Sequence, residues 1–292
     1  DVAGICIKSG NAVILKGGKE ARESCIALHK IIKKALIDSM ASPEVVQFID
    51  PKIKNCVHDI ISANGLIDVI IPRGSANLIN FVRRSASVPV IETGSGVCHT
   101  YVDEEALLDQ SAEIIFNAKT SRPSVCNALD TTVIHKGVAA EFLPKIAKLL
   151  KHKKVEIFAD QESFRILKNI YPKNLLKEAS TVDFGREFLS LKMSVKIVRN
   201  IDEAIKFISR YSSKHSEAIL TENKKKAERF LREIDAAVVY VNASTRFSDG
   251  AVFGLGSEIG ISTDKIHARG PMGTSEMTTY KWIVVGKYNI RI

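Results

Sequence analysis

Short apolar runs rich in β-branched residues alternate with longer segments of helical periodicity along most of this 292-residue chain. Strands that alternate with helices at such spacing pair in parallel and form a doubly wound sheet, a common platform for nucleotides. The sequence therefore predicts an α/β fold. In the first third, the predicted strands are residues 11–15, 45–49 and 67–71, and the predicted helices are residues 21–36, 51–63 and 75–84.

The pattern changes beyond Pro89, where residues 88–92 lead into a Gly-rich turn. A second α/β unit then begins with a strand at 98–102 and a long helix from Asp103. Its further predicted strands are residues 131–135, 155–158, 193–198, 218–221 and 236–242. The expected divisions are a first domain at 1–97, a second domain at 98–266, and a C-terminal loop at 267–292 that ends in an extended strand at 278–292.

Composition excludes several classes of protein. The longest apolar runs, such as residues 236–239, are far too short to span a bilayer, and no basic-then-apolar leader opens the chain. The five cysteines are odd in number and show no C-x-x-C spacing, which favours reduced thiols over a disulfide framework or a zinc site. We therefore expect a cytoplasmic protein with no membrane segment and no metal site.

The chain carries 42 basic and 33 acidic residues, and its formal net charge of +9 favours anionic partners. A phosphorylated substrate, a phosphorylated cofactor and nucleic acid all have the required charge. The basic residues are spread along predicted helices, only 7% of the residues are aromatic, and no stacking motif is present. Nucleic acid is therefore the weaker alternative, and we expect none.

The strongest candidates for catalysis are a thiol and a carboxylate. Cys126 stands in the run Arg122-Pro123-Ser124-Val125-Cys126-Asn127, and Glu92 lies 34 positions upstream. A thiolate attacks carbonyl carbons well, and a nearby carboxylate takes its proton or activates a water. A single cysteine is more often a small buried apolar residue, so the interpretation depends on the surrounding motifs.

Two predicted turns between strand and helix are candidates for binding an anion. The dinucleotide fingerprint G-x-G-x-x-G does not occur in the sequence. Instead, Lys16-Gly17-Gly18-Lys19 follows the first strand, and Arg73-Gly74-Ser75 precedes a later helix. Backbone N–H groups at a helix N-terminus, together with two lysines, suit a phosphate. A solvated surface turn is the alternative for the first of these segments.

Seven segments form a consistent set in chain order: residues 9–21, 71–74, 97–103, 117–119, 122–127, 240–250 and 267–273. They resemble the signatures of the γ-glutamyl phosphate reductase (glutamate-5-semialdehyde dehydrogenase) family of the aldehyde dehydrogenase superfamily. The resemblance covers nearly the whole chain, and its last three segments are specific to the reductase branch. It implies a Rossmann-like parallel-sheet cofactor domain, an α/β catalytic domain and a C-terminal oligomerisation strand.

The resemblance also implies a reaction in proline biosynthesis. The thiolate of Cys126 would displace phosphate from L-glutamyl 5-phosphate, and NADPH would then deliver a hydride and release L-glutamate 5-semialdehyde. Glu92 matches the general-base position of the superfamily. Because a reductive cycle needs no hydrolytic water, a catalytic and a structural role of Glu92 both stay open.

The resemblance assigns further residues to ligands. The NADP(H) candidates are Lys16, Gly17, Gly18, Lys19, Gly74, Ser75 and Glu187, of which Glu187 belongs to an E-x-F element with altered spacing. The substrate candidates are Asn242, Ser244, Thr245, Arg246 and Arg269. Arginine and hydroxyl side chains are suitable donors for carboxylate and phosphate, although an arginine can also staple loops together.

The chain departs from the family at its start. Family members have a segment before the position that corresponds to Asp1, including an asparagine whose amide helps to hold the thioester oxyanion. We expect this chain to be a fragment that is feebly active or inactive alone, because one lost oxyanion donor costs about two to three orders of magnitude in rate. The strand at 278–292 implies a homo-oligomer, and glutamate 5-kinase, which makes the substrate, is a candidate partner.

Two other functions stay open on the sequence. One is an aldehyde dehydrogenase that oxidises a different aldehyde, with Glu92 activating water. The other is a catalytically silent binding or assembly protein on the same fold, which would show steep salt dependence of DNA binding and no cofactor affinity.

Overall fold

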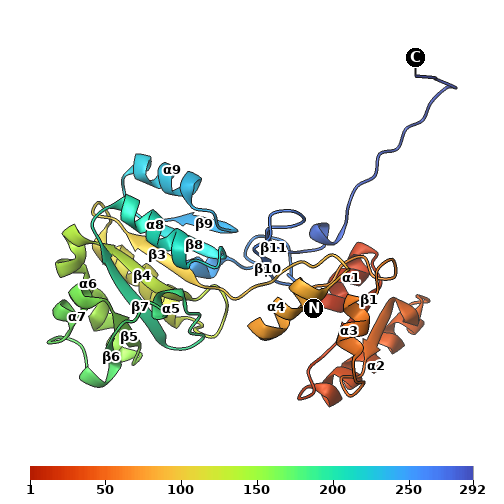
Figure 1. Cartoon of the computed structure of the whole chain (residues 1–292), viewed down its shortest axis with the longest axis horizontal. Coiled ribbons are helices and arrows are strands. Elements are labelled where there is room, and N and C mark those ends of the chain that lie inside the picture. Colours follow the sequence, from red (N-terminus) through yellow and green to blue (C-terminus); the bar gives the residue numbers. More distant parts are fainter. Residues whose placement is uncertain (292) are drawn as a thin grey trace.

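In the computed structural model, which describes residues 1–291, seven parallel strands form the central sheet of the larger lobe in the order β6-β5-β7-β4-β3-β8-β9 (Figure 1). The strands are β3 (Cys98–Val102), β4 (Leu129–His135), β5 (Glu156–Ala159), β6 (Leu176–Glu178), β7 (Lys192–Val198), β8 (Ser216–Leu220) and β9 (Val238–Val241). The central strands β3, β4 and β8 are buried along their whole length. Such burial is typical of parallel strands that are covered on both faces.

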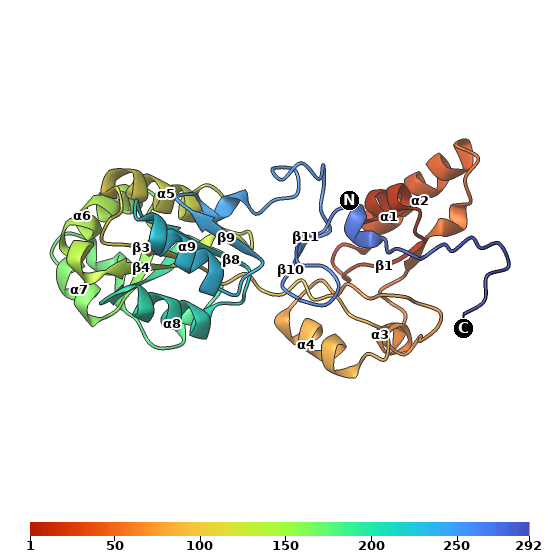
Figure 2. The ribbon, with the colours of Figure 1, turned by 90° about the horizontal axis from the view of Figure 1, so that it is seen from above.

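Helices cover both faces of this sheet (Figure 2). One face carries α5 (Leu108–Thr120), α6 (Lys136–His152) and α7 (Gln161–Leu167), and the other carries α8 (Ile201–Tyr211) and α9 (Lys224–Glu233). Ile115 and Phe142 belong to the first core, and Ile208 and Phe230 to the second. Each such fully buried side chain contributes about 1.5–3 kcal/mol through removal of apolar surface from water.

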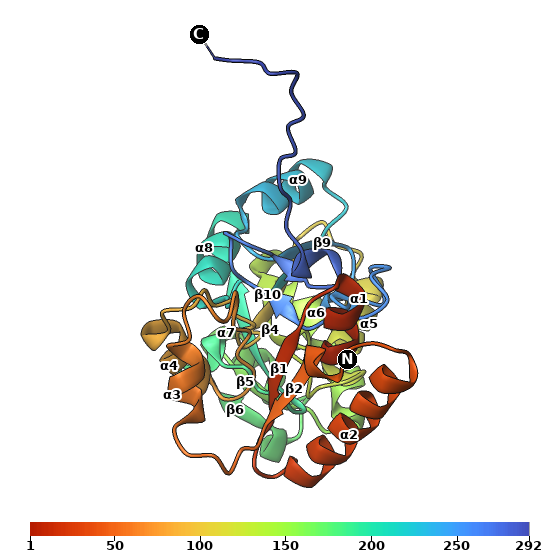
Figure 3. The ribbon, with the colours of Figure 1, turned by 90° about the vertical axis from the view of Figure 1, so that its right-hand side faces the viewer.

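The smaller lobe contains two paired parallel strands, β1 (Val13–Lys16) and β2 (Val46–Ile49). Its helices are α1 (Val2–Ser9), α2 (Arg22–Asp38), α3 (Cys56–Ile61) and α4 (Ala76–Ser85). Helix α2 lies alongside the two strands (Figure 3), and Ala3, Leu36 and Val46 form the buried centre of this layer. Four large apolar side chains of β1 and α2 are exposed: Ile14, Leu28, Ile31 and Ile37.

A segment from the end of the chain packs back onto the smaller lobe. It contains the short antiparallel strands β10 (Ile261–Ser262) and β11 (Gly270–Pro271), which lie between the lobes in Figure 1. The buried cluster there consists of Ile5, Ile91, Ile259, Ala268 and Met272. The domain limits at 97 and 266 stay a proposal, and this cluster couples the segment from Ile259 onward to the smaller lobe. Short 3-10 helices complete the fold at Pro43–Val45, Lys173–Leu175, Asp183–Gly185, Thr245–Phe247 and Ser275–Met277.

Three predicted elements of the chain differ in the structure. The helix predicted at 51–63 is confined to α3, because Asp50 accepts the Lys52 N–H in a turn and Asn55 adopts a left-handed φ of 62°. The strand predicted at 67–71 makes only an isolated bridge between Ile70 and Val90. The helix predicted from Asp103 begins at Leu108, because the Asp103 carboxylate is buried and accepts hydrogen bonds from other segments.

The predicted C-terminal strand forms no paired strand over residues 278–291, and Ile292 lies outside the described residues. This tail projects away from both lobes (Figure 1), and Trp282, Val285 and Ile290 are exposed. Apolar periodicity predicts an extended chain here, but pairing requires a partner strand. Among residues 1–291, no helix has the length and apolar character needed to cross a membrane.

Candidate active site

Cys126 lies at the amino-terminal edge of the large sheet, in the segment that joins α5 to β4. In a parallel sheet all strands begin at the same edge, so the segments that precede β3, β7 and β8 also reach this region. The same edge faces the linker at residues 86–97, which leads to the smaller lobe. Cys126 therefore lies at the junction of the two lobes.

The backbone around Cys126 is tightly packed. Gly96 of the linker lies so close that a Cβ there would overlap the Cys126 carbonyl oxygen. The buried Cys98 thiol donates a hydrogen bond to that same oxygen, with an S···O distance of 3.3 Å. Two neighbouring segments therefore fix the Cys126 backbone, while its side chain keeps partial exposure.

Burial is the main cause that raises the pKa of the Cys126 thiol above its usual value. The nearby carboxylates of Glu258 and Glu187 raise this pKa further, whereas the Arg73 guanidinium lowers it. Two carboxylates and one cation thus act in opposite directions on the pKa of this thiol. Positive charge at this point would favour the reactive thiolate.

Glu187 is held near Cys126 by a backbone contact. Its Oε1 accepts a hydrogen bond from the Gly96 N–H at 2.8 Å, and burial raises its pKa. Because Gly96 also contacts Cys126, Gly96 connects Glu187 to the Cys126 segment. The structure therefore brings this cofactor candidate next to Cys126.

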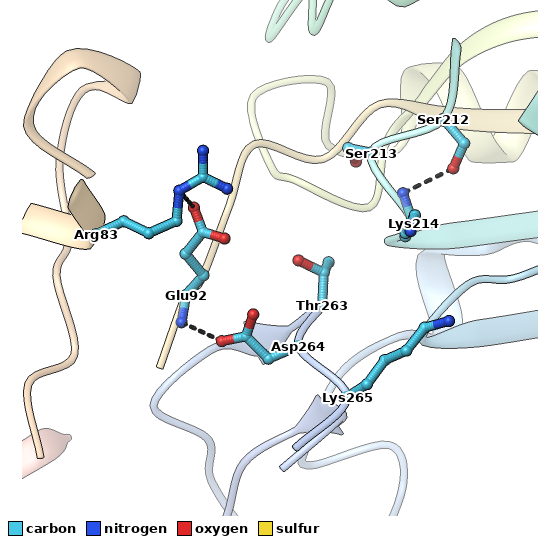
Figure 4. A pocket seen from close by; sticks show the side chains of 8 residues that line it. All are labelled: Arg83, Glu92, Ser212, Ser213, Lys214, Thr263, Asp264 and Lys265. Atoms are coloured by element: carbon cyan, nitrogen blue, oxygen red, sulfur yellow. Dashed lines mark hydrogen bonds and ion pairs between the residues drawn. The ribbon is translucent and has the colours of Figure 1, made fainter. Parts of the chain in front are cut away.

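Glu92 lines an open cavity of about 370 Å³ between the lobes. Its lining residues are Arg83, Glu92, Ser212, Ser213, Lys214, Thr263, Asp264 and Lys265. Figure 4 shows the Arg83 and Glu92 side chains directed toward each other, and the Arg83 Nε lies 3.5 Å from Glu92 Oε1. The Glu92 N–H also donates to Asp264 at 2.7 Å. Cys126 lies outside this lining, so the structure groups Glu92 with Arg83 and Asp264 and not with the thiol.

Three of the substrate candidates lie together next to the nucleophile segment. The Thr245 hydroxyl donates to the Asn127 carbonyl at 2.8 Å, and Arg246 binds the Asn127 side-chain oxygen through Nη1. Ser244 is buried and its hydroxyl accepts the Arg246 N–H at 3.3 Å. The guanidinium of Arg246 is partly exposed and is held by Asn127 and Ser121. This group can therefore present a positive charge close to Cys126.

The other two substrate candidates are engaged elsewhere. The Asn242 side chain accepts the Thr221 N–H and donates to the Thr221 carbonyl, each at 2.9 Å, so it joins the ends of β8 and β9. The Arg269 guanidinium donates to Asp235 at 2.8 Å, and Lys265 pairs with the same carboxylate. Both contacts are structural in character.

The cofactor candidates of the smaller lobe occupy two turns at strand and helix ends. Lys16 and Lys19 are exposed on either side of Gly17, where a Cβ would meet the Cys25 sulfur at 2.9 Å. Gly18, the second glycine of this turn, is partly exposed. These glycines allow the chain to turn closely over α2.

The second turn, at the start of α4, has the geometry of an anion cradle. Gly74 has a φ of 146°, which favours glycine, and the Ser75 hydroxyl caps α4 by accepting the Leu78 N–H at 3.3 Å. The free N–H groups of such a helix end suit a pyrophosphate.

The sequence interpretation missed two residues near the thiol, Arg73 and Glu258. Arg73 had been considered only as part of the turn before α4, and Glu258 stands in a Gly-rich segment without periodicity. Glu258 accepts the Gly250 N–H at 2.9 Å, and burial raises its pKa. No local spacing signals either residue, because their proximity to Cys126 arises from the folding of distant segments.

Comparison with known proteins adds independent findings. Residues 2–164 match the aldehyde dehydrogenase family. The chain is 53% identical to the gamma-glutamyl phosphate reductase of Clostridium acetobutylicum and 52% identical to that of Pelodictyon phaeoclathratiforme, each over 291 residues. These matches cover 100% of this chain and 68% and 69% of the relatives.

Two solved structures show the same arrangement. The crystal structure of gamma-glutamyl phosphate reductase from Thermotoga maritima aligns with a TM-score of 0.93 at 44% identity, over 100% of this chain and 69% of that chain. An acetylating aldehyde dehydrogenase from Geobacillus thermoglucosidasius aligns with a TM-score of 0.76 at 16% identity, over 100% of this chain and 72% of that chain. The second likeness shows the fold alone.

Proposed function

Because the chain belongs to the gamma-glutamyl phosphate reductase family of the aldehyde dehydrogenases, we propose that Cys126 is the nucleophile with which it converts L-glutamyl 5-phosphate into L-glutamate 5-semialdehyde. The activity is that of a glutamate-5-semialdehyde dehydrogenase in proline biosynthesis. The observation that carries the proposal is the position of Cys126, partly exposed at the lobe junction with Glu187, Thr245 and Arg246 around it.

The Cys126 thiolate attacks the acyl carbon, and the carbon–oxygen bond to phosphate breaks with its electron pair on the phosphate oxygen. The resulting thioester is held beside the Cys126 backbone, which Gly96 and Cys98 keep in place. Arg246 is suited to the substrate carboxylate because its guanidinium is anchored by Asn127 and partly open to solvent. Phosphate leaves without help from an activated water, so the position of Glu92 beside Arg83 is compatible with this chemistry.

The family uses nicotinamide cofactors, and we propose NADP(H) for this chain. When bound, the cofactor supplies the hydride that reduces the thioester. The residues fit such a group: the left-handed Gly74 and the Ser75 cap form a cradle for pyrophosphate at α4, and Lys16 and Lys19 are exposed cations at the end of β1. The two lysines favour a cofactor with an additional phosphate. Glu187, which accepts the Gly96 N–H, would meet the nicotinamide half.

We also propose that the protein forms a homo-oligomer through its C-terminal tail. Residues 278–291 expose Tyr280, Trp282, Ile283, Val284 and Val285, in an extended segment whose backbone can pair with another sheet. Analytical ultracentrifugation of this chain and of a form shortened after residue 277 tests the proposal. A monomer in both cases would contradict it. Coupling to glutamate 5-kinase stays a prediction that pull-down with that kinase can test.

The activity is tested by following reduction of NADP⁺ with glutamate 5-semialdehyde in the presence and absence of inorganic phosphate. We expect turnover that needs phosphate and vanishes in Cys126→Ala, while Cys56→Ala, which removes a thiol in α3, keeps it. A form with the full length of the relatives, of which this chain covers 68%, tests whether the chain alone is feebly active. Turnover without phosphate would instead support an aldehyde-oxidising enzyme.

A further inference from the structure

Arg73 lies at the junction of the lobes. Its guanidinium is close to the backbone of residues 259–272, which pack back onto the smaller lobe and are called the returning segment. A Cβ on Gly260 would overlap Arg73 Nη1 and would lie 3.5 Å from its Cζ. A side chain at position 260 would therefore push the guanidinium of Arg73 out of its present place. Thr93 of the linker borders the same spot, with its Cγ2 3.1 Å from the Gly260 Cβ position.

Arg73 forms no ion pair with the described residues of the chain. Over residues 1–291, no carboxylate lies within 4.0 Å of its guanidinium and no side chain accepts a hydrogen bond from it. Other arginines of this region are engaged: Arg83 with Glu92, and Arg269 with Asp235. An exposed arginine with free donors is suited to bidentate binding of a phosphate or carboxylate.

Arg73 is also close enough to the nucleophile to act on it electrostatically. It lowers the pKa of Cys126, and it acts in the same direction on Glu258. Both of these groups lie where the returning segment, the linker and the nucleophile loop converge. A ligand held by Arg73 would therefore lie between the turn at α4 and the thiol.

We propose that Arg73 binds the phosphate of the acyl phosphate substrate next to Cys126 and so selects phosphate as the leaving group. The inference rests on the proposed function and adds the residue that recognises the phosphate. In the forward step, the S–C bond forms and the C–O bond breaks with its electron pair on the phosphate oxygen; the proton given up by the thiol passes to the phosphate, which departs as the hydrogen phosphate dianion paired with the guanidinium. In reverse, an oxygen of bound phosphate attacks the thioester and the thiolate leaves. Arg246, anchored on Asn127, is then left for the carboxylate at the other end of the substrate.

Arg73 and Arg246 can bind opposite ends of the substrate because they belong to different lobes. Arg246 comes from the larger lobe, in the segment after β9, whereas Arg73 comes from the smaller lobe before α4. A substrate with an anionic group at each end would therefore bridge the two lobes across Cys126. The phosphate is therefore bound by a residue of the smaller lobe, outside the seven-stranded sheet.

The first test measures phosphate binding without turnover. The rate of iodoacetamide alkylation at Cys126 is followed by mass spectrometry at rising inorganic phosphate, with chloride added to equal ionic strength. We expect saturable protection in the wild-type chain and in the control Arg84→Met, which removes an exposed arginine of α4. Arg73→Met should need at least about tenfold more phosphate for half protection, and Arg73→Lys should fall between them. Equal protection in Arg73→Met and Arg84→Met, or none in the wild type, would overturn the inference.

The second test uses turnover in the oxidative direction. We expect Arg73→Met to raise the KM for phosphate at least about tenfold while the KM for glutamate 5-semialdehyde changes less than about threefold. A rise in both constants together would indicate general damage to the site and would contradict a phosphate-specific role. Thermal unfolding of Arg73→Met and Arg73→Lys confirms that both are folded. If a form with the full length of the relatives also shows no phosphate-dependent turnover, the proposed function fails, whereas protection by phosphate still decides the role of Arg73.

Discussion

Gly96 and Cys126 are in direct backbone contact, and the linker between the lobes therefore supports the Cys126 segment. A Cβ at position 96 would lie 2.6 Å from the Cys126 carbonyl carbon and 2.9 Å from its Cα. The same glycine donates its N–H to Glu187. One residue thus couples the nucleophile, a cofactor candidate and the lobe connection.

Substitution Gly96→Ala should displace the Cys126 segment, because the added methyl group meets rigid backbone atoms. We expect a loss of about 1–3 kcal/mol in the free energy of unfolding and a fall of about 100-fold in turnover. Urea unfolding and steady-state kinetics measure these changes. The control Gly94→Ala has only Thr263 Oγ1 within reach, at 3.8 Å, and should retain activity. Equal activity of the two variants would contradict the role given to Gly96.

The carboxylate of Glu258 should set the reactivity of the thiol. Because its negative charge raises the pKa of Cys126, Glu258→Gln is expected to lower that pKa and to shift the pH profile of Cys126 alkylation toward lower pH. Arg73→Met should shift the profile in the opposite direction, since it removes the cation that favours the thiolate. Glu178→Gln, at an exposed carboxylate of β6, serves as the control and should leave the profile in place. A shift of the Glu258→Gln profile toward higher pH would refute this account.

Lys19 should contribute to the choice between NADPH and NADH. It is exposed in the turn that follows β1, and an acidic side chain there would repel the additional phosphate of NADPH. We expect Lys19→Glu to raise the KM for NADPH at least about tenfold relative to that for NADH. Lys30→Glu, which makes the same charge change on the exposed surface of α2, should leave the ratio unchanged. An unchanged ratio in Lys19→Glu would remove this residue from the cofactor site.

Much of the larger lobe was predictable, because its central strands carry the signal that burial on both faces produces. Strand β4 is buried throughout and begins within two residues of its predicted start at 131. Strand β6 escaped prediction because only Leu176 of its three residues is buried. The strand predicted at 67–71 was wrong for the opposite reason. Its apolar residues predict a buried strand, yet none of them is buried, and Ile70 meets a partner only at Val90.

The chemistry of the site was predictable only where residue type and local motif coincide. Arg246 stands in a motif of its own, and the structure brings it to Asn127, next to Cys126. The environment that tunes the thiol was not predictable, because Arg73 and Glu258 come from distant segments that meet only in the folded chain. Arg269 was expected at the ligand, yet Asp235 engages it, and composition contains no sign of that contact.

The buried pair of Lys119 and Asp130 supports the same region from inside the larger lobe. Lys119 Nζ lies 3.7 Å from Asp130 Oδ1, and both side chains are almost fully buried. Asp130 accepts hydrogen bonds from the backbone N–H groups of Cys98 and Phe188. Cys98 donates to the Cys126 carbonyl oxygen, and Phe188 follows Glu187 in the chain. Burial raises the pKa of Asp130 to about 6, against the opposing effect of Lys119.

Lys119→Met should therefore destabilise the protein in a pH-dependent way. Without the cation, the pKa of Asp130 rises further, and the folded state must either hold a proton or bury an unpaired charge. A carboxyl group with a raised folded pKa stabilises the fold at low pH, and that contribution is lost as pH rises toward the folded pKa. We expect the loss in the free energy of unfolding to be about 3–5 kcal/mol at pH 8 and smaller at pH 5.

Urea unfolding at the two pH values measures this difference. The double variant Lys119→Met/Asp130→Asn should recover most of the loss at pH 8, because the asparagine is neutral and its oxygen can still accept the Phe188 N–H. Lys145→Met, which breaks a surface ion pair with Asp109, should cause only a small change that is similar at both pH values. A loss in Lys119→Met that is equal at pH 5 and pH 8 would show that Asp130 does not titrate in this range. The importance of Lys119 would then lie in its packing against Phe188 and not in its charge.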